Sequence, residues 1–113
     1  MALAAAALLA AACGEDDDSP QAVARAWVAT SEHSKCALLR PELLEQLTGR
    51  TGAAAREACE RNVVRAPRRR DVRVAEVEVA GARAEVEVRF HGGETRVQLL
   101  RGDDGWRISG VGD

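Results

Sequence analysis

The sequence has few aromatic residues, a single lysine and no apolar run long enough to cross a membrane. Aromatic residues make up 3% of the 113 residues and include no tyrosine, so a phenolic hydroxyl is excluded from any site. Lys35 is the single lysine, the chain has 15 arginines, and the net charge is −2. Because nucleic-acid-binding domains carry a strong positive field, this balance argues against a nucleic-acid partner. Hydrophobic residues at 46% and charged residues at 30% indicate one small globular domain.

The longest apolar run lies at the N-terminus, from Leu3 to Ala12, and ends at Cys13. It is half the length of a membrane-spanning helix, which needs roughly 20 residues, but it suits the apolar region of a signal peptide. Acidic residues at 15–18 follow and make a solvated, self-repelling segment. The pattern resembles a bacterial lipoprotein signal, in which the cysteine is acylated. We expect residues 1–12 to be a signal peptide, Cys13 to carry the lipid and residues 13–20 to form an acidic tether.

Two positions depart from the lipoprotein pattern. Ala10 occupies the place where such signals prefer leucine, and no lysine or arginine precedes Cys13. We therefore expect the true start to lie upstream of Met1. With a lipid on Cys13, the protein would be exported and anchored to the outer face of the cytoplasmic membrane. An ordinary cleaved signal peptide and an alanine-rich helix of a cytosolic protein are the alternative interpretations.

Three cysteines leave one without a partner in an oxidising compartment. If Cys13 is lipidated, Cys36 and Cys59 remain as a pair around a loop of about 22 residues, and a disulfide there would stabilise the fold by roughly 3 kcal/mol. Two buried free thiols are the alternative. Cysteine and histidine nowhere recur at metal-ligand spacing, so we expect no metal ion and no cofactor.

Residues 21–113 are expected to form one α+β domain whose first half is helical. Ser19 and Pro20 have the residue types of an N-cap and a first helical position. An apolar stripe follows at helical spacing: Val23, Ala26, Trp27 and Thr30. Proline or glycine ends later segments because these residues interrupt helices. The expected helical segments are 20–32, 34–39, 41–47, stopped by Thr48-Gly49, and 52–62, capped by Thr51.

After residue 67 the apolar period changes from 3.6 to 2, which predicts a four-stranded antiparallel sheet. In a regular strand Val72 and Val74 would point to one face of the sheet, and Val77 and Val79 would point to the other. One extra residue at Ala75-Glu76 would restore a single apolar face, as a β-bulge does. The expected turns are Ala80-Gly81, His91–Glu94 and Gly102–Gly105. The other apolar positions expected to face the helices are Ala82, Ala84, Val86, Val88, Phe90, Thr95, Val97, Leu99, Trp106 and Ile108.

Charged residues alternate with these apolar positions and indicate a strand register. The turn at Ala80-Gly81 and the bulge would place opposite charges across the first two strands: Glu78 with Arg83, Arg73 with Glu87 and Asp71 with Arg89. The outer face is too charged for a large apolar dimer interface, so a monomer is expected. Its charged residues are Arg73, Glu78, Arg83, Glu85, Glu87, Arg89, Arg96 and Arg107.

Several segments together form a recognisable order along the chain. They are the acidic tether, Ala26-Trp27, Cys36–Leu39 followed by Pro41–Leu43, Cys59, and the closing Asp104–Ile108. This order resembles secreted actinobacterial lipoproteins with a nuclear-transport-factor-2-like (NTF2-like) cone fold. The resemblance implies about three helices packed on a curved, bulged four-stranded antiparallel sheet. It implies no chemistry, because the fold hosts enzymes and non-enzymatic modules alike, and an isomerase-type oxyanion hole would need the missing tyrosine.

Candidate acid–base groups are few, because the inward sheet positions carry neither acids nor bases. Glu32 and His33 could form a pair at the mouth of the cone, although a helix-end histidine that interacts with the helix dipole is the preferred interpretation. His91 lies in an expected turn, where we expect it to be solvated. No residue is therefore assigned a catalytic role beyond this candidate pair.

Candidate binding residues are the aromatic rings and a basic run. Trp27, Phe90 and Trp106 could line an apolar pocket, with core packing as the alternative. The segment between helix and sheet could contact anionic lipid head groups, with a solvated linker as the alternative. Its arginines are Arg65, Arg68, Arg69 and Arg70.

The sequence thus favours a membrane-tethered extracytoplasmic binding or scaffold module without evident catalysis. One alternative is a small-ligand enzyme that uses Glu32 and His33. Another is an accessory subunit of a cell-envelope complex that docks through the charged outer face. The expected partners are the membrane, through the lipid on Cys13, and an envelope protein.

Overall fold

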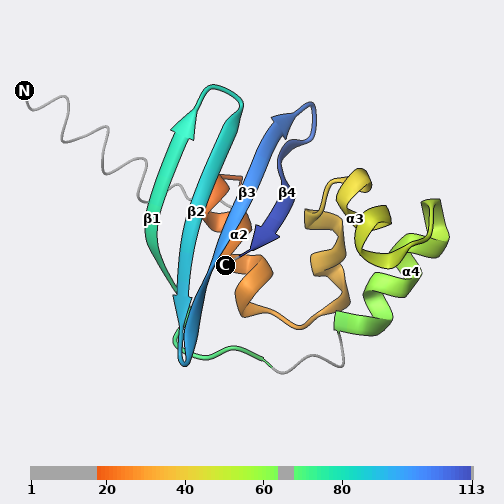
Figure 1. Ribbon diagram of the computed structural model, residues 1–113, viewed down its shortest axis with the longest axis horizontal. Helices are drawn as coiled ribbons and strands as arrows, with labels where there is room; N and C mark the ends of the chain where they lie inside the picture. Colours follow the sequence, from red (N-terminus) through yellow and green to blue (C-terminus); the bar gives the residue numbers. More distant parts are fainter. Residues whose placement is uncertain (1–17, 64–67, 113) are drawn as a thin grey trace, which may run out of the picture.

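Helices come first along the chain and strands second, and together they form an α+β fold (Figure 1). The computed structural model describes residues 18–63 and 68–112. The expected signal peptide at 1–12, Cys13 as the expected lipid attachment point, most of the expected tether and Arg65 lie outside the described residues. The helical elements are α2 (Pro20–Ala29), the 3-10 helix η1 (His33–Leu38), α3 (Pro41–Thr48) and α4 (Gly52–Val63). The strands are β1 (Arg73–Ala80), β2 (Arg83–Phe90), β3 (Gly93–Gly102) and β4 (Gly105–Gly112).

Helix α2 begins as the sequence predicts but ends sooner. Ser19 is its N-cap, and the Ser19 hydroxyl oxygen accepts a hydrogen bond from the Ala22 N–H at 3.1 Å. The helix ends at Ala29 instead of residue 32, because the backbone at Thr30 is extended. The predicted apolar stripe is wrong at one position. Ala26 is exposed, because the face of the helix that carries Ala24 is the one turned toward the sheet.

The segment between η1 and α3 is fastened to the edge of the sheet. Leu39 forms a parallel bridge with Ile108 of β4, and the Arg40 N–H donates a hydrogen bond to the Ile108 carbonyl oxygen at 2.8 Å. Helix α3 then starts at Pro41 and stops at Gly49, whose φ of 71° is the left-handed conformation of a helix end. These limits agree with the sequence prediction.

The four strands form one antiparallel sheet in the order β1-β2-β3-β4. The register shifts between Val74 and Glu76, which confirms the β-bulge expected at Ala75-Glu76. A second shift, between Gln98 and Leu99, accommodates an extra residue of β4, and the sequence did not indicate it. Each bulge bends its strand and increases the local twist.

The charge pairing expected across β1 and β2 is wrong by two residues. Ala80 pairs with Arg83, so the turn starts at Gly81, and Glu78 lies opposite Glu85. Gly81 supplies the positive φ, 63°, that two-residue hairpin turns favour. Turn geometry therefore outweighs the cross-strand charge pairs, each of which contributes below about 1 kcal/mol. The other observed pairs include Arg73 with Arg89 and Glu76 with Glu87, in place of Arg73 with Glu87 and Asp71 with Arg89.

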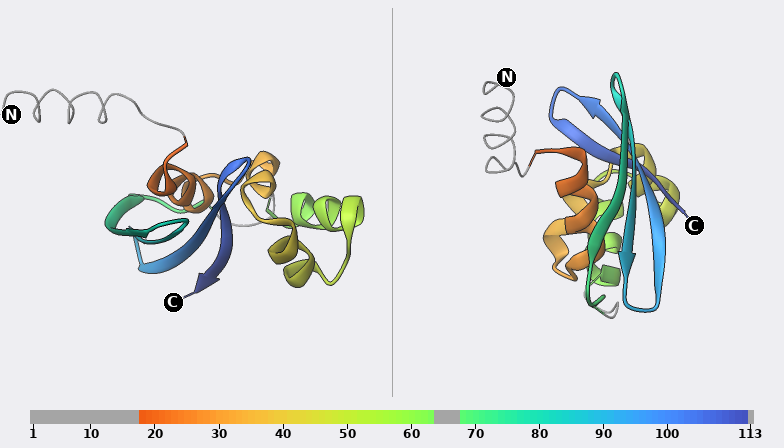
Figure 2. Two further views of the ribbon diagram at one scale, coloured as in Figure 1. Left: turned by 90° about the horizontal axis from the view of Figure 1, so that it is seen from above. Right: turned by 90° about the vertical axis from the view of Figure 1, so that its left-hand side faces the viewer.

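Helix α2 covers one face of the sheet, whereas α3 and α4 lie beyond the β4 edge (Figure 1, Figure 2). The end of β1 extends past α2, so Val79 is 55% exposed and the apolar face predicted there is not covered. None of the described helices is both long and apolar enough to cross a membrane. The buried strand residues beneath α2 include Val86, Val88, Val97, Leu99 and Ile108.

A disulfide between Cys36 and Cys59 joins η1 to α4 and confirms the predicted pair. The two Cα atoms are 6.1 Å apart, and both side chains are buried. Helix α4 packs on η1 and α3 rather than on the face of the sheet. The disulfide is therefore the covalent tie that holds α4 to the rest of the domain.

We expect removal of this disulfide to destabilise the domain. In the Cys36→Ser/Cys59→Ser double variant the unfolded chain regains the entropy of a loop spanning 23 residues, which corresponds to about 3 kcal/mol. Urea unfolding followed by tryptophan fluorescence measures the loss. The Cys13→Ser variant is the control and should keep the wild-type midpoint. An unchanged midpoint in the double variant would contradict the structural role of the disulfide.

Candidate functional site

The three aromatic residues expected to line a pocket lie in two different places. Trp27 and Phe90 border one hollow with a volume of about 290 Å³. Trp106 lies in the core, 7% exposed, where the guanidinium carbon of Arg101 stands 5.4 Å from its ring centroid. Two of the rings thus meet around a hollow, and the third takes the core position that the sequence left open as the alternative.

Segments far apart in the sequence converge on this space, which we call the cationic hollow. The end of α2 and its following loop form one wall, and η1 forms the next. The segment before β1, the β2–β3 hairpin and the edge strand β4 complete it. Six of its lining residues are Trp27, Lys35, Arg69, Phe90, Thr95 and Val111.

Lys35 is a half-buried cation at the wall of the hollow. Its Nζ lies 4.3 Å from the centroid of the Trp27 ring and donates a hydrogen bond to the Thr30 carbonyl oxygen at 2.8 Å. Burial, followed by the nearby positive charge of Arg69, holds the pKa of the Lys35 ammonium below its ordinary value. The aromatic ring and the backbone carbonyl therefore keep in place a charge that its surroundings otherwise disfavour.

Arg69 provides the second cation of the hollow. Its guanidinium carbon lies 4.4 Å from the centroid of the Phe90 ring. The next residue anchors the segment, because the His91 N–H donates a hydrogen bond to the Arg70 carbonyl oxygen at 2.8 Å. Asp71 then turns the chain into β1 with a φ of 58°, a left-handed conformation that aspartate tolerates better than most residues.

Neither cation has an acidic partner among residues 18–63 and 68–112. The ion pairs formed within these ranges involve neither Lys35 nor Arg69. Glu94 also lines the hollow, but its Oε1 lies 3.6 Å from Arg89 Nε. The hollow thus combines two positive charges with two aromatic rings and is suited to holding an anion.

The candidate acid–base residues are placed away from this arrangement. Glu32 is exposed and caps η1 through its backbone without a side-chain hydrogen bond. His33 is the first residue of η1, and its side chain lies outside the described part of the structure. His91 is exposed in the turn between β2 and β3. The structure does not bring Glu32 or His91 into the cationic hollow.

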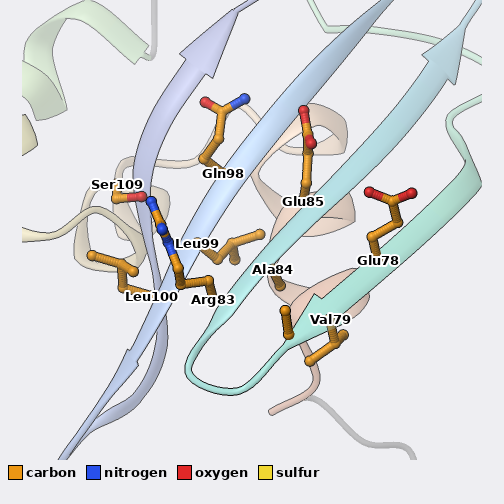
Figure 3. Close-up of a pocket in the computed structure, with 10 residues that line it drawn as sticks. Glu78, Val79, Arg83, Ala84, Glu85, Gln98, Leu99, Leu100 and Ser109 are labelled. Carbon is orange, nitrogen blue, oxygen red and sulfur yellow. The ribbon is translucent and has the colours of Figure 1, made fainter.

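A wider trough of about 620 Å³ lies on the outer face of the sheet, turned away from α2 (Figure 3). Glu78, Glu85 and Gln98 stand side by side on β1, β2 and β3 along its floor. Arg96 Nη1 lies 3.5 Å from Glu85 Oε2, so one of these acids already has a basic partner. The trough is charged and open but contains no aromatic ring.

Glu87 is the one buried charged residue among those that the structure describes. Its side chain is 10% exposed, and its Oε2 accepts a hydrogen bond from Arg89 Nε at 3.1 Å. It lies on the outer face, opposite Arg96 of β3. The burial of Glu87 is therefore compensated by arginines and does not mark a separate site.

No group of acidic, histidine and cysteine side chains in the described ranges could hold a metal ion. Comparisons with protein-family models, with curated proteins and with solved structures found no match. The cationic hollow is therefore interpreted from its own geometry.

Lys35 is a site residue that the sequence patterns did not indicate. A lone lysine in a chain with 15 arginines was a usable signal, as was its place directly before Cys36. What the sequence could not show was the approach of Arg69, which is separated from Lys35 by two helices. In the sequence, Arg69 is distinguished only as one member of a basic run.

We expect Lys35 to titrate below the ordinary 10.5 of a lysine side chain. Because Lys35 is the single lysine, ¹³C-lysine labelling gives one Cε signal whose shift against pH reports this pKa directly. Arg69 and Glu94 face the same hollow, and the Arg69→Gln variant should move the pKa back toward 10.5. Since the folded state binds this proton less readily, folding stability should rise as the pH rises from the folded pKa toward 10.5. A pKa at or above 10.5 would contradict the burial of the ammonium.

Proposed function

We propose that this protein is a lipid-anchored binding or scaffold module on the outer face of the cytoplasmic membrane, without evident catalysis. One observation carries the proposal: Cys36 and Cys59 are joined, which leaves Cys13 alone at the end of the apolar run. Disulfides of this kind persist in oxidising compartments, so the pair supports export. An exported cysteine directly behind a leader-like run is the expected attachment point for a lipid.

Binding is favoured over catalysis by the distribution of ionisable groups. The space between α2 and the sheet is filled by valine, alanine, leucine and isoleucine side chains, which can neither donate nor accept a proton. Glu32, one half of the competing acid–base pair, is exposed to solvent. The cationic hollow offers two positive charges and apolar surface, and it is the proposed binding site.

The NTF2-like relationship belongs to the same proposal. Its support is the order of the elements, with helices first and a bulged antiparallel sheet afterwards. Among the helices, α2 covers one face of the sheet, and α3 contacts the edge strand β4 (Figure 2). Function does not follow from this likeness, because one fold hosts many activities.

We expect the Cys13→Ser variant, expressed from its own gene in a host that lipidates bacterial exported proteins, to leave the membrane fraction. The physical reason is that a lipid chain supplies most of the membrane affinity of such a protein. Fractionation followed by mass spectrometry of the N-terminal peptide measures both the location and the acyl groups. The Cys36→Ser/Cys59→Ser variant is the matched control and should remain membrane-bound. Retention of Cys13→Ser in the membrane, or an unmodified Cys13 in the wild type, would overturn the anchor.

The trough on the outer sheet face supports a second candidate function, that of an accessory subunit in an envelope complex. Arg83 lines the trough and is exposed. If a partner docks there, Arg83→Glu should abolish cross-links from that face in intact cells, because a reversed charge disfavours a complementary surface. Arg25→Glu, on the exposed side of α2, is the control. Identical cross-links for both variants would contradict docking through the trough.

A further inference from the structure

Two positive charges share the cationic hollow without an acidic partner among the described residues. Lys35 is half-buried, and the repulsion from Arg69 adds to the cost of its burial. A charge removed from water without an opposite charge lowers the stability of the folded protein. An anion that enters the hollow would offset this cost in folding stability, so the two cations favour a negatively charged occupant.

Hydrogen-bond donors remain free for such an occupant. The Lys35 ammonium has three N–H donors, and the structure engages one of them, on the Thr30 carbonyl oxygen. No hydrogen bond within the described ranges uses the guanidinium of Arg69, whose fork can bind two oxygens of a carboxylate or phosphate. The rings of Trp27 and Phe90 keep both cations in position.

The remaining walls favour an occupant that is larger than a bare inorganic ion and partly apolar. Trp27, Val28, Phe90 and Val111 present apolar surface to the same space, and Val111 is 42% exposed. The volume of about 290 Å³ would hold about ten water-sized groups. A carboxylate or phosphate fills less than half of that, which leaves room for a ring or a short chain beside the anionic group.

We propose that the cationic hollow binds an anionic group, a carboxylate or a phosphate ester, attached to an apolar ring or chain. Lys35 and Arg69 hold the anion, and Trp27, Phe90 and Val111 cover the apolar part. The inference rests on the proposed function in so far as it takes the domain to be a binding module. The ligand is free in solution or is the head group of an anionic lipid; the chemistry recognised is the same.

The test uses the full chain and two probes, benzoate and phenyl phosphate, with uncharged benzyl alcohol for comparison. The two tryptophans give two indole signals in a ¹H–¹⁵N spectrum, assigned by the Trp27→Phe variant, and Lys35 gives one ¹³Cε signal. Both anions should shift the Trp27 and Lys35 signals and leave Trp106 unchanged. Anion binding should also raise the pKa of Lys35, because a nearby negative charge favours its protonated form.

Variants separate the hollow from general surface charge. Arg69→Gln should weaken binding of both anions at least about tenfold, the effect of losing one charge-assisted hydrogen bond. Arg70→Gln removes the neighbouring exposed charge and should change the affinity less than about twofold. Lys35→Met should also weaken binding, and Arg101→Gln is its control, because Arg101 likewise covers a tryptophan ring but lies on the core residue Trp106. Arg69→Gln keeps the test valid if Lys35→Met fails to fold.

Vesicles distinguish the two sources of the anion. If vesicles with phosphatidylglycerol displace phenyl phosphate and vesicles of phosphatidylcholine do not, the natural ligand class is a lipid head group. If neither vesicle competes, it is a soluble anion. Both results support the proposed chemistry.

Several results would overturn it. They are the absence of shifts with probe in large excess, equal binding of benzyl alcohol, and equal losses in Arg69→Gln and Arg70→Gln. Asp113 follows Gly112 in the sequence and lies outside the described residues, so a variant tests whether its carboxylate competes with the probes. If anions bind only after Asp113→Asn, the cations serve the chain itself and the proposal falls. If the protein binds anions but Cys13→Ser stays in the membrane fraction, the lipid anchor alone is overturned. If Cys13→Ser leaves the membrane fraction but the protein binds no anion, this inference alone is overturned.

Discussion

The disulfide between Cys36 and Cys59 is the constraint on which the candidate site depends. Helix η1 is a single 3-10 segment without a side-chain cap, and such short segments have little stability of their own. Cys36 is buried in its middle and fixes it to α4, while the following Leu39 is bridged to the β4 edge. Lys35 directly precedes Cys36, so the covalent link also places the ammonium beside Trp27. The proposal of export and the geometry of the cationic hollow therefore both rest on this bond.

Trp27 connects this constraint to the rest of the fold. It lies at the end of the α2 stripe and borders both the cationic hollow and a smaller apolar recess that also includes Leu44 and Cys59. The aromatic ring is thus shared between the disulfide-linked helices and the open hollow. A cation lies over each of the three aromatic rings; Trp106 is buried in the core, whereas Trp27 and Phe90 are partly buried and pack against the core beside the hollow.

Local patterns in the sequence predicted much of the fold, and distant approaches could not be predicted. The Ser19 cap, the Gly49 stop and the bulge near Ala75 each follow from a few neighbouring residues, and the structure confirms them. The predicted register of β1 and β2 is wrong because the turn at Gly81 fixes the pairing, and turn geometry is a stronger constraint than cross-strand charge pairs. The cationic hollow could not be predicted from the sequence for a different reason. Its two cations and two rings come from α2, η1, the segment before β1 and β2. These segments are far apart in the sequence, so no local pattern of residues links them.

The anchor and the hollow reinforce each other if both proposals hold. Seven residues from Cys13 to Ser19 extend at most about 25 Å, and the rise along α2 from Pro20 to Trp27 adds about 10 Å. The hollow would then stay within a few tens of ångströms of the lipid head groups. Two cations and two rings offer too few contacts for tight capture of a dilute ligand. A site confined to a surface rich in anions faces a high local concentration, and weak contacts are then enough. The modest size of the hollow is therefore consistent with a tethered module and would be a poor design for a freely diffusing one.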